Sequence, residues 1–423
     1  MRILIHGINF APELTGIGKY TGEMAAYLAA QGHVVHVVTA PPYYPQWKVA
    51  AGYRAWAYRR EAWQDTEVYR CPLWTPAQPT GLSRLLHLSS FALSSLPALA
   101  GQVAWRPQVV IAVAPALLAA PAAWLAGRLA GARTWLHIQD FELDAAVRLG
   151  LLPALKPFMR LLAGNESLFY RRFDRVSTIS HRMLQALWRK GLSRQKTVYF
   201  PNWVDTQAIH PLPAGGERLP AVAALLPSGC RTIILYSGNI SHKQGLEVVV
   251  EAAKRLVGQP ELQFVLCGEG STRPRLERQA AGLANVHFIP LQPPERLNEL
   301  LNAAAIHILP QQAGAADLVM PSKLAGILAS GRPVIVTAAP DTELAEVIEG
   351  RWSLACQPLA PGSPLGEVIP PGDPARLAEA IQTLSMQPMR QAELGQRGRT
   401  FVEQHWDKQQ VLAAFSQELE KLV

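Results

Sequence analysis

Two turns in the second half of the chain place glycines where a phosphate could bind. In LYSGNISHKQGLE, Gly238 and Asn239 follow an apolar run, and Lys243 comes just before a helical pattern. Free N–H groups at a helix start attract anions, and a lysine adds positive charge there. In LCGEGSTRPRLE, Gly268 and Gly270 follow a second apolar run, where the backbone can approach a ligand closely. Ordinary turns with a solvated lysine are the competing interpretation.

A third stretch, PQQAGAADLVMPSKLAGILASGRPVIVT, places Asp317, Ser322 and Lys323 before a helical pattern that ends at Gly331. Ser322 is also a residue type that commonly caps a helix, which is its simplest interpretation. Ligands of open α/β sheets bind outside the carboxyl ends of the strands. We therefore expect these turns to form one site.

A polar cluster follows a predicted strand in the first half of the chain. In TWLHIQDFELDAA, His137, Asp140, Glu142 and Asp144 lie at or beyond the strand's carboxyl end. Carboxylates at that edge are typical of catalytic groups, and Asp140 is our preferred candidate. His137 could equally be a hydrogen-bonded core histidine, and the two later acids suit the first turn of a helix.

Residues 41–60 interleave aromatic side chains with basic ones, including Trp47, Lys48, Arg59 and Arg60. Such a segment can bind a single-stranded nucleic acid by stacking and charge. It can equally hold a sugar and a phosphate, or be a structured surface loop.

The first strand is followed by a long loop with Gly16, Gly18 and Gly22. The dinucleotide fingerprint G-x-G-x-x-G would require a glycine at position 21, where Thr21 stands. The glycines also come about ten residues after the strand rather than directly after it. NAD binding is therefore not indicated.

The positive charge of the chain is concentrated in its first half. Residues 1–200 carry a net charge of +12, whereas residues 201–423 carry −4. This asymmetry points to an anionic partner on one domain: a nucleic acid, an anionic lipid or a phosphorylated substrate. The four cysteines lie far apart without a CxxC pair, which argues against a zinc site and fits a reducing cytosol. No signal peptide is indicated at the start.

Short β-branched runs alternate with helical stretches in both halves, which predicts two parallel-sheet α/β domains. The expected strands of the first half are residues 3–7, 34–39, 67–71, 109–112, 134–138, 175–179 and 198–200. Those of the second half are residues 232–237, 263–267, 286–289, 306–309 and 334–337. The stretch FPNWVDTQAIHPLPAGGERLP is rich in Pro and Gly and predicts a linker.

Residues 85–105 and 109–127 contain no Asp, Glu, Lys or Arg. For residues 109–127 we expect a buried strand and a helix. For residues 85–105, contact with a membrane interface and a plain core helix are about equally favoured, and a true membrane span is disfavoured by serines and Pro97.

Taken together, the stretches FPNWVD, SGN…KQGLE, GEG…RLE, PSKL…ASGRPVI and PPGDPARLAEAI resemble the family-4 glycosyltransferases of the GT-B fold. The resemblance covers essentially the whole chain. Within that family, TAPPYYPQW and LHIQDFELDA are similar to the group that builds colanic-acid-type exopolysaccharide and is taken to transfer fucose.

The resemblance implies two Rossmann-like, doubly wound α/β domains facing a central cleft. Residues 1–203 would form the acceptor domain, residues 204–399 the nucleotide-sugar domain, and a C-terminal helix at about 400–423 would return to the first. It also implies retention of anomeric configuration without a bound metal or other tightly bound cofactor. The donor would be a nucleotide sugar, with a GDP-sugar favoured and GDP-fucose the best guess. The acceptor would be a polyprenyl-pyrophosphate-linked glycan, met by a cytoplasmic enzyme peripheral on the inner face of the plasma membrane.

The resemblance also assigns roles to residues. Asp140 and His137 would be catalytic, and the acceptor would contact Trp47, Lys48, Arg59 and Arg60. The donor site would comprise Gly16, Gly18, Lys19, Gly238, Asn239, Lys243, Gln244, Gly268, Gly270, Asp317, Ser322 and Lys323.

Three departures from the family pattern affect this assignment. Many members have Gly-Arg where this chain has Gly238–Asn239, and a pair of glutamates where it has Leu318 and Gly326. Asp317, Ser322 and Lys323 are candidates to replace that pair, and Gln139–Asp140 stands where His-Asp is usual.

The sequence leaves several other functions open. A UDP-sugar, or another envelope glycan as acceptor, would fit the same fold. A GT-B epimerase or phosphorylase is a second enzyme class. A nucleic-acid-binding protein is an alternative that the glycine turns count against, and we expect no nucleic-acid partner.

Overall fold

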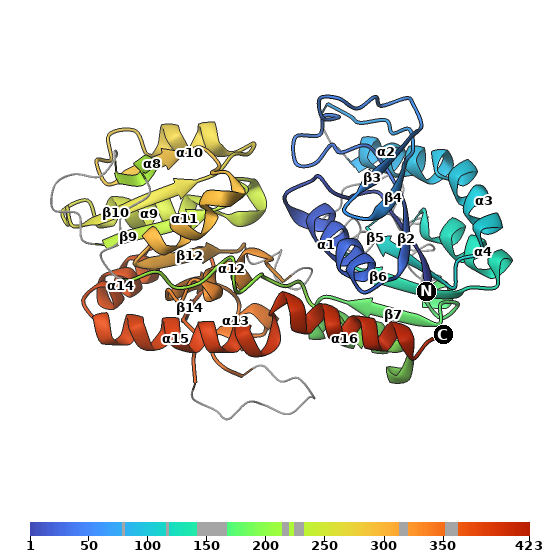
Figure 1. Ribbon diagram of the computed structural model, residues 1–423. Coiled ribbons are helices and arrows are strands. Elements are labelled where there is room, and N and C mark those ends of the chain that lie inside the picture. The colour runs from blue at the N-terminus through green and yellow to red at the C-terminus, as the bar shows by residue number, and fades with distance from the viewer. Residues whose placement is uncertain are drawn as a thin grey trace. The chain divides into compact units, whose positions relative to one another are not determined.

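The computed structural model describes residues 1–77, 81–115, 118–141, 167–213, 220–223, 232–312, 320–351 and 363–423. The chain forms two compact units (Figure 1). Unit 1 comprises Met1–Pro201 and Val411–Val423, and unit 2 comprises Asn202–Gln410. The chain thus passes between the units next to Pro201 and next to Gln410, where the sequence analysis placed the boundaries at 203 and about 400.

Unit 1 is built on an eight-stranded sheet with the order β3-β4-β2-β1-β5-β6-β7-β8. Its strands are β1 (Arg2–Gly7), β2 (Val34–Thr39), β3 (Arg59–Trp63), β4 (Thr66–Arg70), β5 (Val109–Ala114), β6 (Arg133–Ile138), β7 (Arg175–Thr178) and β8 (Thr197–Tyr199). All neighbours are parallel except β3, which pairs antiparallel with β4 at the edge. Every strand expected in this half is present. β3 was not expected, because its polar sequence RREAW alternates between exposed and half-buried positions.

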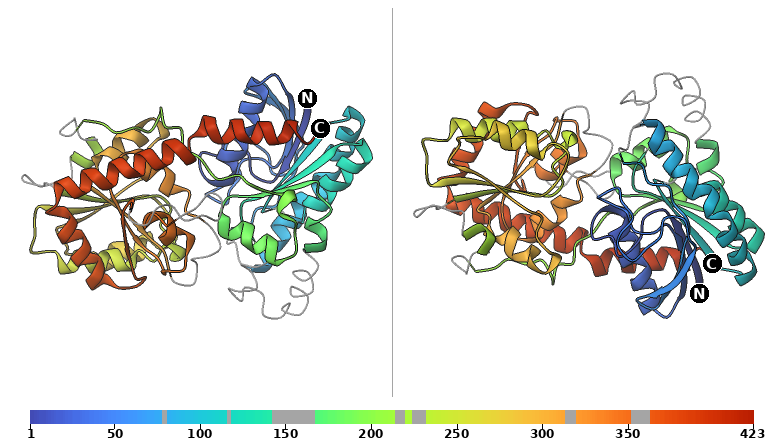
Figure 2. Two further views of the ribbon diagram at one scale, coloured as in Figure 1. Left: turned by 90° about the horizontal axis from the view of Figure 1, so that it is seen from below. Right: turned by 90° about the horizontal axis from the view of Figure 1, so that it is seen from above.

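Helices cover both faces of this sheet. They are α1 (Gly16–Ala30), α2 (Gly81–Ser94), α3 (Leu96–Trp105), α4 (Ala120–Ala130), α7 (His181–Arg189) and most of α16 (Lys408–Glu420). A short 3-10 helix η2 (Arg194–Lys196) precedes β8. Figure 2 shows α16, which ends near the C-terminus, beside the strands of unit 1. Its Phe415 stacks on Phe200 at 4.2 Å between ring centroids and meets Trp135 at 5.0 Å.

Unit 2 is built on a six-stranded parallel sheet with the order β11-β10-β9-β12-β13-β14. The strands are β9 (Thr232–Ser237), β10 (Leu262–Cys267), β11 (Val286–Ile289), β12 (Ile306–Pro310), β13 (Val334–Thr337) and β14 (Glu367–Ile369). The five expected strands are present, and the three-residue β14 was not expected.

The helices of unit 2 also lie on both faces, as a doubly wound sheet requires. They are α8 (Pro220–Ala223), η3 (His242–Gln244), α9 (Glu247–Arg255), α10 (Arg273–Gln279), η4 (Pro294–Arg296), α11 (Leu297–Ala303), α12 (Lys323–Ala329), α13 (Glu343–Ile348), α14 (Pro374–Ser385) and α15 (Pro388–His405). Ile234 and Phe264 face one hydrophobic core and their neighbours Ile233 and Val265 face the other, so successive strand residues alternate between the two.

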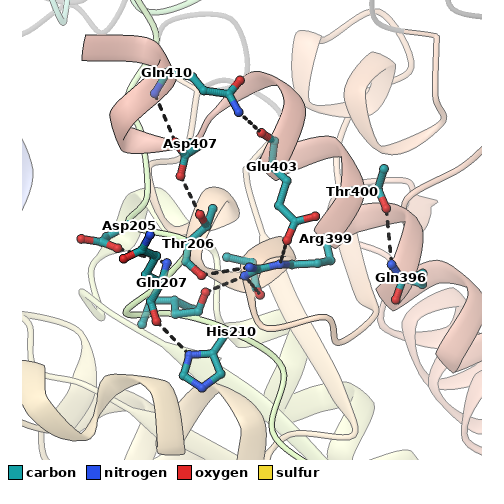
Figure 3. Close-up of polar contacts among 12 residues, drawn as sticks. Asp205, Thr206, Gln207, His210, Gln396, Arg399, Thr400, Glu403, Asp407 and Gln410 are labelled. Atoms are coloured by element: carbon teal, nitrogen blue, oxygen red, sulfur yellow. Dashed lines mark hydrogen bonds and ion pairs between the residues drawn. The ribbon is translucent and has the colours of Figure 1, made fainter. Parts of the chain in front are cut away.

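The two chain segments next to the unit boundaries are bonded to each other within unit 2 (Figure 3). Val204 donates its N–H to the carbonyl of Trp406 at 3.0 Å, and Thr206 donates its hydroxyl to Asp407 at 2.6 Å. Arg399 donates to the carbonyls of Thr206 at 2.9 Å and Ile209 at 2.7 Å. Residues 204–209 of the predicted linker are therefore bonded into unit 2.

The charge-free residues 85–105 form parts of two helices rather than one. Phe91 on α2 and Leu99 on α3 are buried, whereas Leu82, Leu86 and Leu93 on α2 are exposed by 55%, 53% and 68%. The segment thus has both a core side and an apolar surface. Among the described residues, no helix combines the length and the apolar character needed to cross a lipid bilayer.

Candidate active site

The glycine turns of unit 2 touch each other at the carboxyl edge of the sheet. Gly238 follows β9, and Gly268 and Gly270 follow its neighbour β10, with φ angles of 134°, 152° and 156°. A Cβ atom on Gly268 would lie 1.8 Å from the carbonyl oxygen of Gly238, and one on Gly270 would lie 2.1 Å from that of Ile240. Only glycine therefore allows the two turns to pack backbone against backbone, and the structure brings the two predicted turns together.

Two backbone N–H groups of these turns already donate hydrogen bonds to backbone carbonyls of unit 2. Gly238 donates its N–H to the carbonyl of Cys267 at 2.8 Å, and Gly268 donates to that of Ile289 at 3.0 Å. Arg273 fixes the second turn by donating to the carbonyl of Gly268 at 2.7 Å. An anion at this edge therefore needs positive charge from a side chain.

Lys323, the first residue of α12, brings an amine that can carry such a charge to the turn after β9. Its Nζ donates a hydrogen bond to the hydroxyl of Tyr236 at 2.5 Å and lies 4.3 Å from the centroid of that ring. The hydroxyl of Tyr236 in turn donates to the carbonyl of Asn239 at 2.5 Å. Lys323, Tyr236 and the glycine turn are thus joined by a continuous chain of hydrogen bonds.

The amine of Lys323 lies in a poorly solvated environment. The residue as a whole is half-buried, but its amine end is the buried part, and burial lowers the pKa of Lys323 to about 7. Burial also raises the pKa of Tyr236, so that its hydroxyl stays protonated. Within the described part of the chain, no carboxylate lies within ion-pair distance of Nζ. A poorly solvated amine without a counter-ion is well suited to bind an anion.

The other donor candidates of unit 2 differ in how the structure places them. Gln244 accepts a hydrogen bond from the hydroxyl of Ser241 at 2.5 Å, and Asn239 is exposed. Ser322 is exposed at the N-cap position of α12 without a capping hydrogen bond from its side chain. Lys243 lies in η3, and the structure does not describe its side chain. Asp317 lies outside the described residues.

In unit 1 the glycine loop is organised by Glu13, which the sequence analysis missed. The Glu13 side chain is buried, and its Oε1 accepts hydrogen bonds from the N–H groups of Tyr43 at 3.1 Å and Tyr44 at 3.0 Å. Oε2 accepts one from the amide of Asn9 at 2.9 Å. Burial raises the pKa of Glu13, whereas these hydrogen bonds lower it. The glutamate thus joins the glycine loop to the start of the aromatic segment.

Close contacts within unit 1 explain why glycine occupies two of the predicted positions in this loop. A Cβ atom on Gly18 would lie 2.3 Å from the carboxylate of Glu13, and one on Gly16 would lie 3.3 Å from the ring of Tyr44. Gly16 also has a φ of 64° where α1 begins. Lys19 follows on α1, with its Nζ 3.9 Å from Glu23. Donor contact by this loop stays a prediction.

Arg70 is a second residue that the sequence does not reveal. It is 1% exposed, and its guanidinium donates to Glu61 at 2.9 Å and to the carbonyls of Ala40 at 3.0 Å and Ala11 at 2.5 Å. A buried arginine with this many partners holds the loop after β1 against the loop after β2. No local pattern marks it, because its partners are distant in sequence.

The two catalytic candidates of unit 1 have different environments. His137 on β6 is 3% exposed, and its Nδ1 lies 2.9 Å from the hydroxyl of Ser177. Burial lowers the pKa of His137 to about 3, which keeps the ring neutral. This geometry favours the core-histidine interpretation. Asp140 is half-buried just beyond the carboxyl end of β6, where a catalytic carboxylate is expected. Glu142 and Asp144 lie outside the described residues.

The predicted acceptor residues lie in two places. Trp47 is half-buried with its ring 5.7 Å from that of Tyr43, and Lys48 beside it is exposed. Arg59 and Arg60 lie on the edge strand β3 and form ion pairs with Glu61 and Glu67. The basic pair is therefore part of the sheet rather than of a loop.

Comparison with known proteins identifies the family. A model described as "Glycosyl transferase 4-like domain" matches residues 15–203, and one described as "Glycosyl transferases group 1" matches residues 231–387. The putative colanic acid biosynthesis glycosyl transferase WcaI of Escherichia coli (strain K12) is 47% identical over 353 residues, covering 82% of this chain and 86% of that protein. The chain belongs to these glycosyltransferases. It is therefore an enzyme that uses a nucleotide sugar, and the resemblance to the family is confirmed.

Solved structures support the fold of this glycosyltransferase. Sucrose-phosphate synthase from Thermosynechococcus elongatus aligns with a TM-score of 0.71 at 17% identity, covering 100% of this chain and 98% of that one. HepE of Anabaena, in complex with UDP and glucose, aligns with a TM-score of 0.67 at 15% identity over 100% of both chains. At this identity the likeness concerns the fold, and it confirms the expected GT-B class.

Proposed function

We propose that this glycosyltransferase moves a sugar from a nucleotide diphosphate to a polyprenyl-pyrophosphate-linked glycan during synthesis of a colanic-acid-like exopolysaccharide. GDP-fucose is the preferred donor, with a UDP-sugar as the alternative, and the transfer retains the anomeric configuration. The observation that carries the proposal is the 47% identity with a protein named for colanic acid biosynthesis.

The donor's diphosphate would bind in unit 2, beside the turn after β9. When the bond to the sugar breaks, negative charge develops on the leaving diphosphate and must be stabilised. The amine of Lys323, joined to the turn through Tyr236, supports this role. Lys243, in η3, is a second candidate, and neither role requires a metal ion.

Unit 1 would supply the acceptor side. Asp140, half-buried after β6, would orient the acceptor hydroxyl or the reacting sugar. The exposed side chains of Leu82, Leu86 and Leu93 on α2 form an apolar surface, and the first half of the chain carries a net charge of +12. Apolar insertion and positive charge together favour peripheral binding to anionic lipid. We therefore propose that the enzyme meets its acceptor at the inner face of the plasma membrane.

The test is a transfer assay with a panel of donors and a polyprenyl-pyrophosphate-linked sugar as acceptor. GDP-fucose, GDP-mannose, UDP-glucose and UDP-galactose are compared at equal concentration, and the linkage formed is assigned by NMR. Preferred transfer from GDP-fucose with an anomeric configuration equal to the donor's supports the proposal. Preferred transfer from a UDP-sugar would replace the donor assignment, and inversion would overturn the retaining mechanism.

A further inference from the structure

We propose that Lys323 takes up a proton when the donor's diphosphate binds, and that Tyr236 is the residue that positions its amine for this. The inference rests on the proposed donor site in unit 2 and assigns a role within it. It makes the affinity for the donor depend on pH through one identified amine.

The geometry restricts where the amine can be. The Cε and Nζ atoms of Lys323 lie 2.4 Å and 2.6 Å from the place that a Cβ atom on Gly238 would occupy. The side chain therefore lies directly over the backbone of the turn. The hydroxyl of Tyr236 accepts a hydrogen bond from Nζ on one side and donates to the carbonyl of Asn239 on the other. Because its only O–H is donated to the turn while its oxygen accepts from Nζ, the hydroxyl holds the amine beside the turn.

The charged and titratable groups on neighbouring elements leave the amine without a described counter-ion. Tyr236 on β9 contacts it directly and stays neutral, because burial raises its pKa. His242 and Lys243 lie in η3, and neither is an anion at neutral pH. Glu269, after β10, is ion-paired with Arg273 at 2.6 Å. Within the described ranges, the amine thus has a hydroxyl and an aromatic ring as partners and no carboxylate.

This environment favours the neutral amine in the empty site, in agreement with a pKa of Lys323 lowered to about 7. A diphosphate carries two negative charges, and an anion beside an amine favours its charged form. Binding should therefore draw a proton from solvent whenever the pH is above the pKa of the empty site. At pH 8 most of the amine is neutral in the empty site, so binding should be accompanied by a net uptake of protons that is smaller at lower pH.

The experiment is isothermal titration calorimetry of the full chain at pH 8, with GDP-fucose and then UDP-glucose as probes. Both phosphates of a nucleotide sugar are esterified and carry no titrating proton at this pH, so any proton must enter the protein. Titrations in HEPES and in Tris, whose ionisation enthalpies differ, give the number of protons taken up. We expect clear proton uptake by the wild type at pH 8 and less uptake at pH 7.

Three variants separate the roles. Lys323→Arg keeps a permanent charge and should bind the probe with no proton uptake, whereas Lys323→Met should bind at least tenfold more weakly. Tyr236→Phe keeps the ring but loses the hydroxyl, and should weaken binding about three- to tenfold and shift the pH dependence of uptake. Matched controls are Lys254→Met, an exposed lysine on α9, and Tyr58→Phe, whose hydroxyl bonds a main-chain carbonyl in unit 1.

The outcomes distinguish this inference from the proposed function. If the wild type binds a nucleotide sugar without proton uptake, or if Lys323→Met binds as tightly as wild type, the inference is overturned and the function stands. A Tyr236→Phe variant that matches Tyr58→Phe in affinity and pH dependence removes the positioning role. If neither probe binds the wild type, the proposed donor site is wrong, and so is the inference that rests on it. Circular dichroism confirms that each variant is folded.

Discussion

The amine end of Lys323 occupies the space that a side chain on Gly238 would need, with Cε 2.4 Å from the position of an ideal Cβ atom. Gly238→Ala should therefore displace Lys323 as well as strain a backbone whose φ is 134°. We expect donor affinity to fall at least tenfold in calorimetry. Gly282→Ala is the matched control, since its φ is 84° and a Cβ atom there would meet open space. Both substitutions place a side chain at a positive φ, but only the one at Gly238 also meets Lys323, so equal donor affinity in the two would contradict the steric argument.

Asp140→Asn should lower turnover more than donor affinity. Asp140 lies at the carboxyl edge of the unit 1 sheet, whereas the proposed diphosphate site lies in unit 2. Loss of a group that acts on the reacting hydroxyl typically costs about 10²- to 10⁴-fold in rate. Steady-state kinetics and donor titration on the same preparation check this. A variant that keeps its maximal rate and loses donor binding would reverse the assignment.

Glu13→Gln should destabilise unit 1, although the two side chains have nearly the same shape. The new amide group would face the amide of Asn9, so two donors would meet where a carboxylate oxygen now accepts. A buried polar group left without a partner costs about 1–3 kcal/mol, which urea unfolding can measure. Glu23→Gln, at a half-exposed position on α1, is the control and should change stability by much less. Equal effects of the two changes would show that the buried hydrogen bonds of Glu13 are unimportant.

Stability should fall as the pH is lowered from 7 towards 4. His6, His137 and His307 are fully buried, and burial lowers the pKa of each to about 3 from the usual value near 6.5. Between these values the unfolded chain binds more protons than the folded one, so acid favours unfolding and the stabilisation is complete only above about 6.5. Urea unfolding at pH 7 and pH 4.5 measures the difference. A free energy of unfolding that is constant over this range would rule out neutral buried histidines.

Replacing Leu82, Leu86 and Leu93 with Ser should weaken binding to vesicles without unfolding the protein. All three side chains are exposed on α2, whereas Phe91 on the same helix is 0% exposed. Co-sedimentation with vesicles containing phosphatidylglycerol should show wild-type binding that decreases with added salt, and weaker binding by the triple variant. Phe91→Ser is the contrasting variant, which should lose helical signal in far-UV circular dichroism. Absence of wild-type binding to any vesicle, or binding indifferent to both salt and lipid charge, would exclude the membrane role.

The sequence predicted the two sheets well, because parallel strands buried on both faces are continuous apolar runs such as VVIAVA in β5. It failed for β3, whose residues are exposed on one side, and for β14, which has three residues. The glycine turns could be predicted, since glycine at a strand end is a local signal. Tyr236 could not, because it has the appearance of an ordinary strand residue. Its partner Lys323 is 87 positions away, and only the folded sheet brings them together.

The packing of Phe415 on Phe200 and Trp135 has a consequence for the order of assembly during synthesis. The aromatic rings from β6 and from the segment after β8 are made early, but Phe415, which covers them, comes after all of unit 2. During synthesis, part of the apolar surface of the first sheet should therefore stay uncovered while more than two hundred further residues are added. We expect the sheet to be completed only after unit 2 has been made, and a nascent chain stalled before α16 to need a chaperone at that surface.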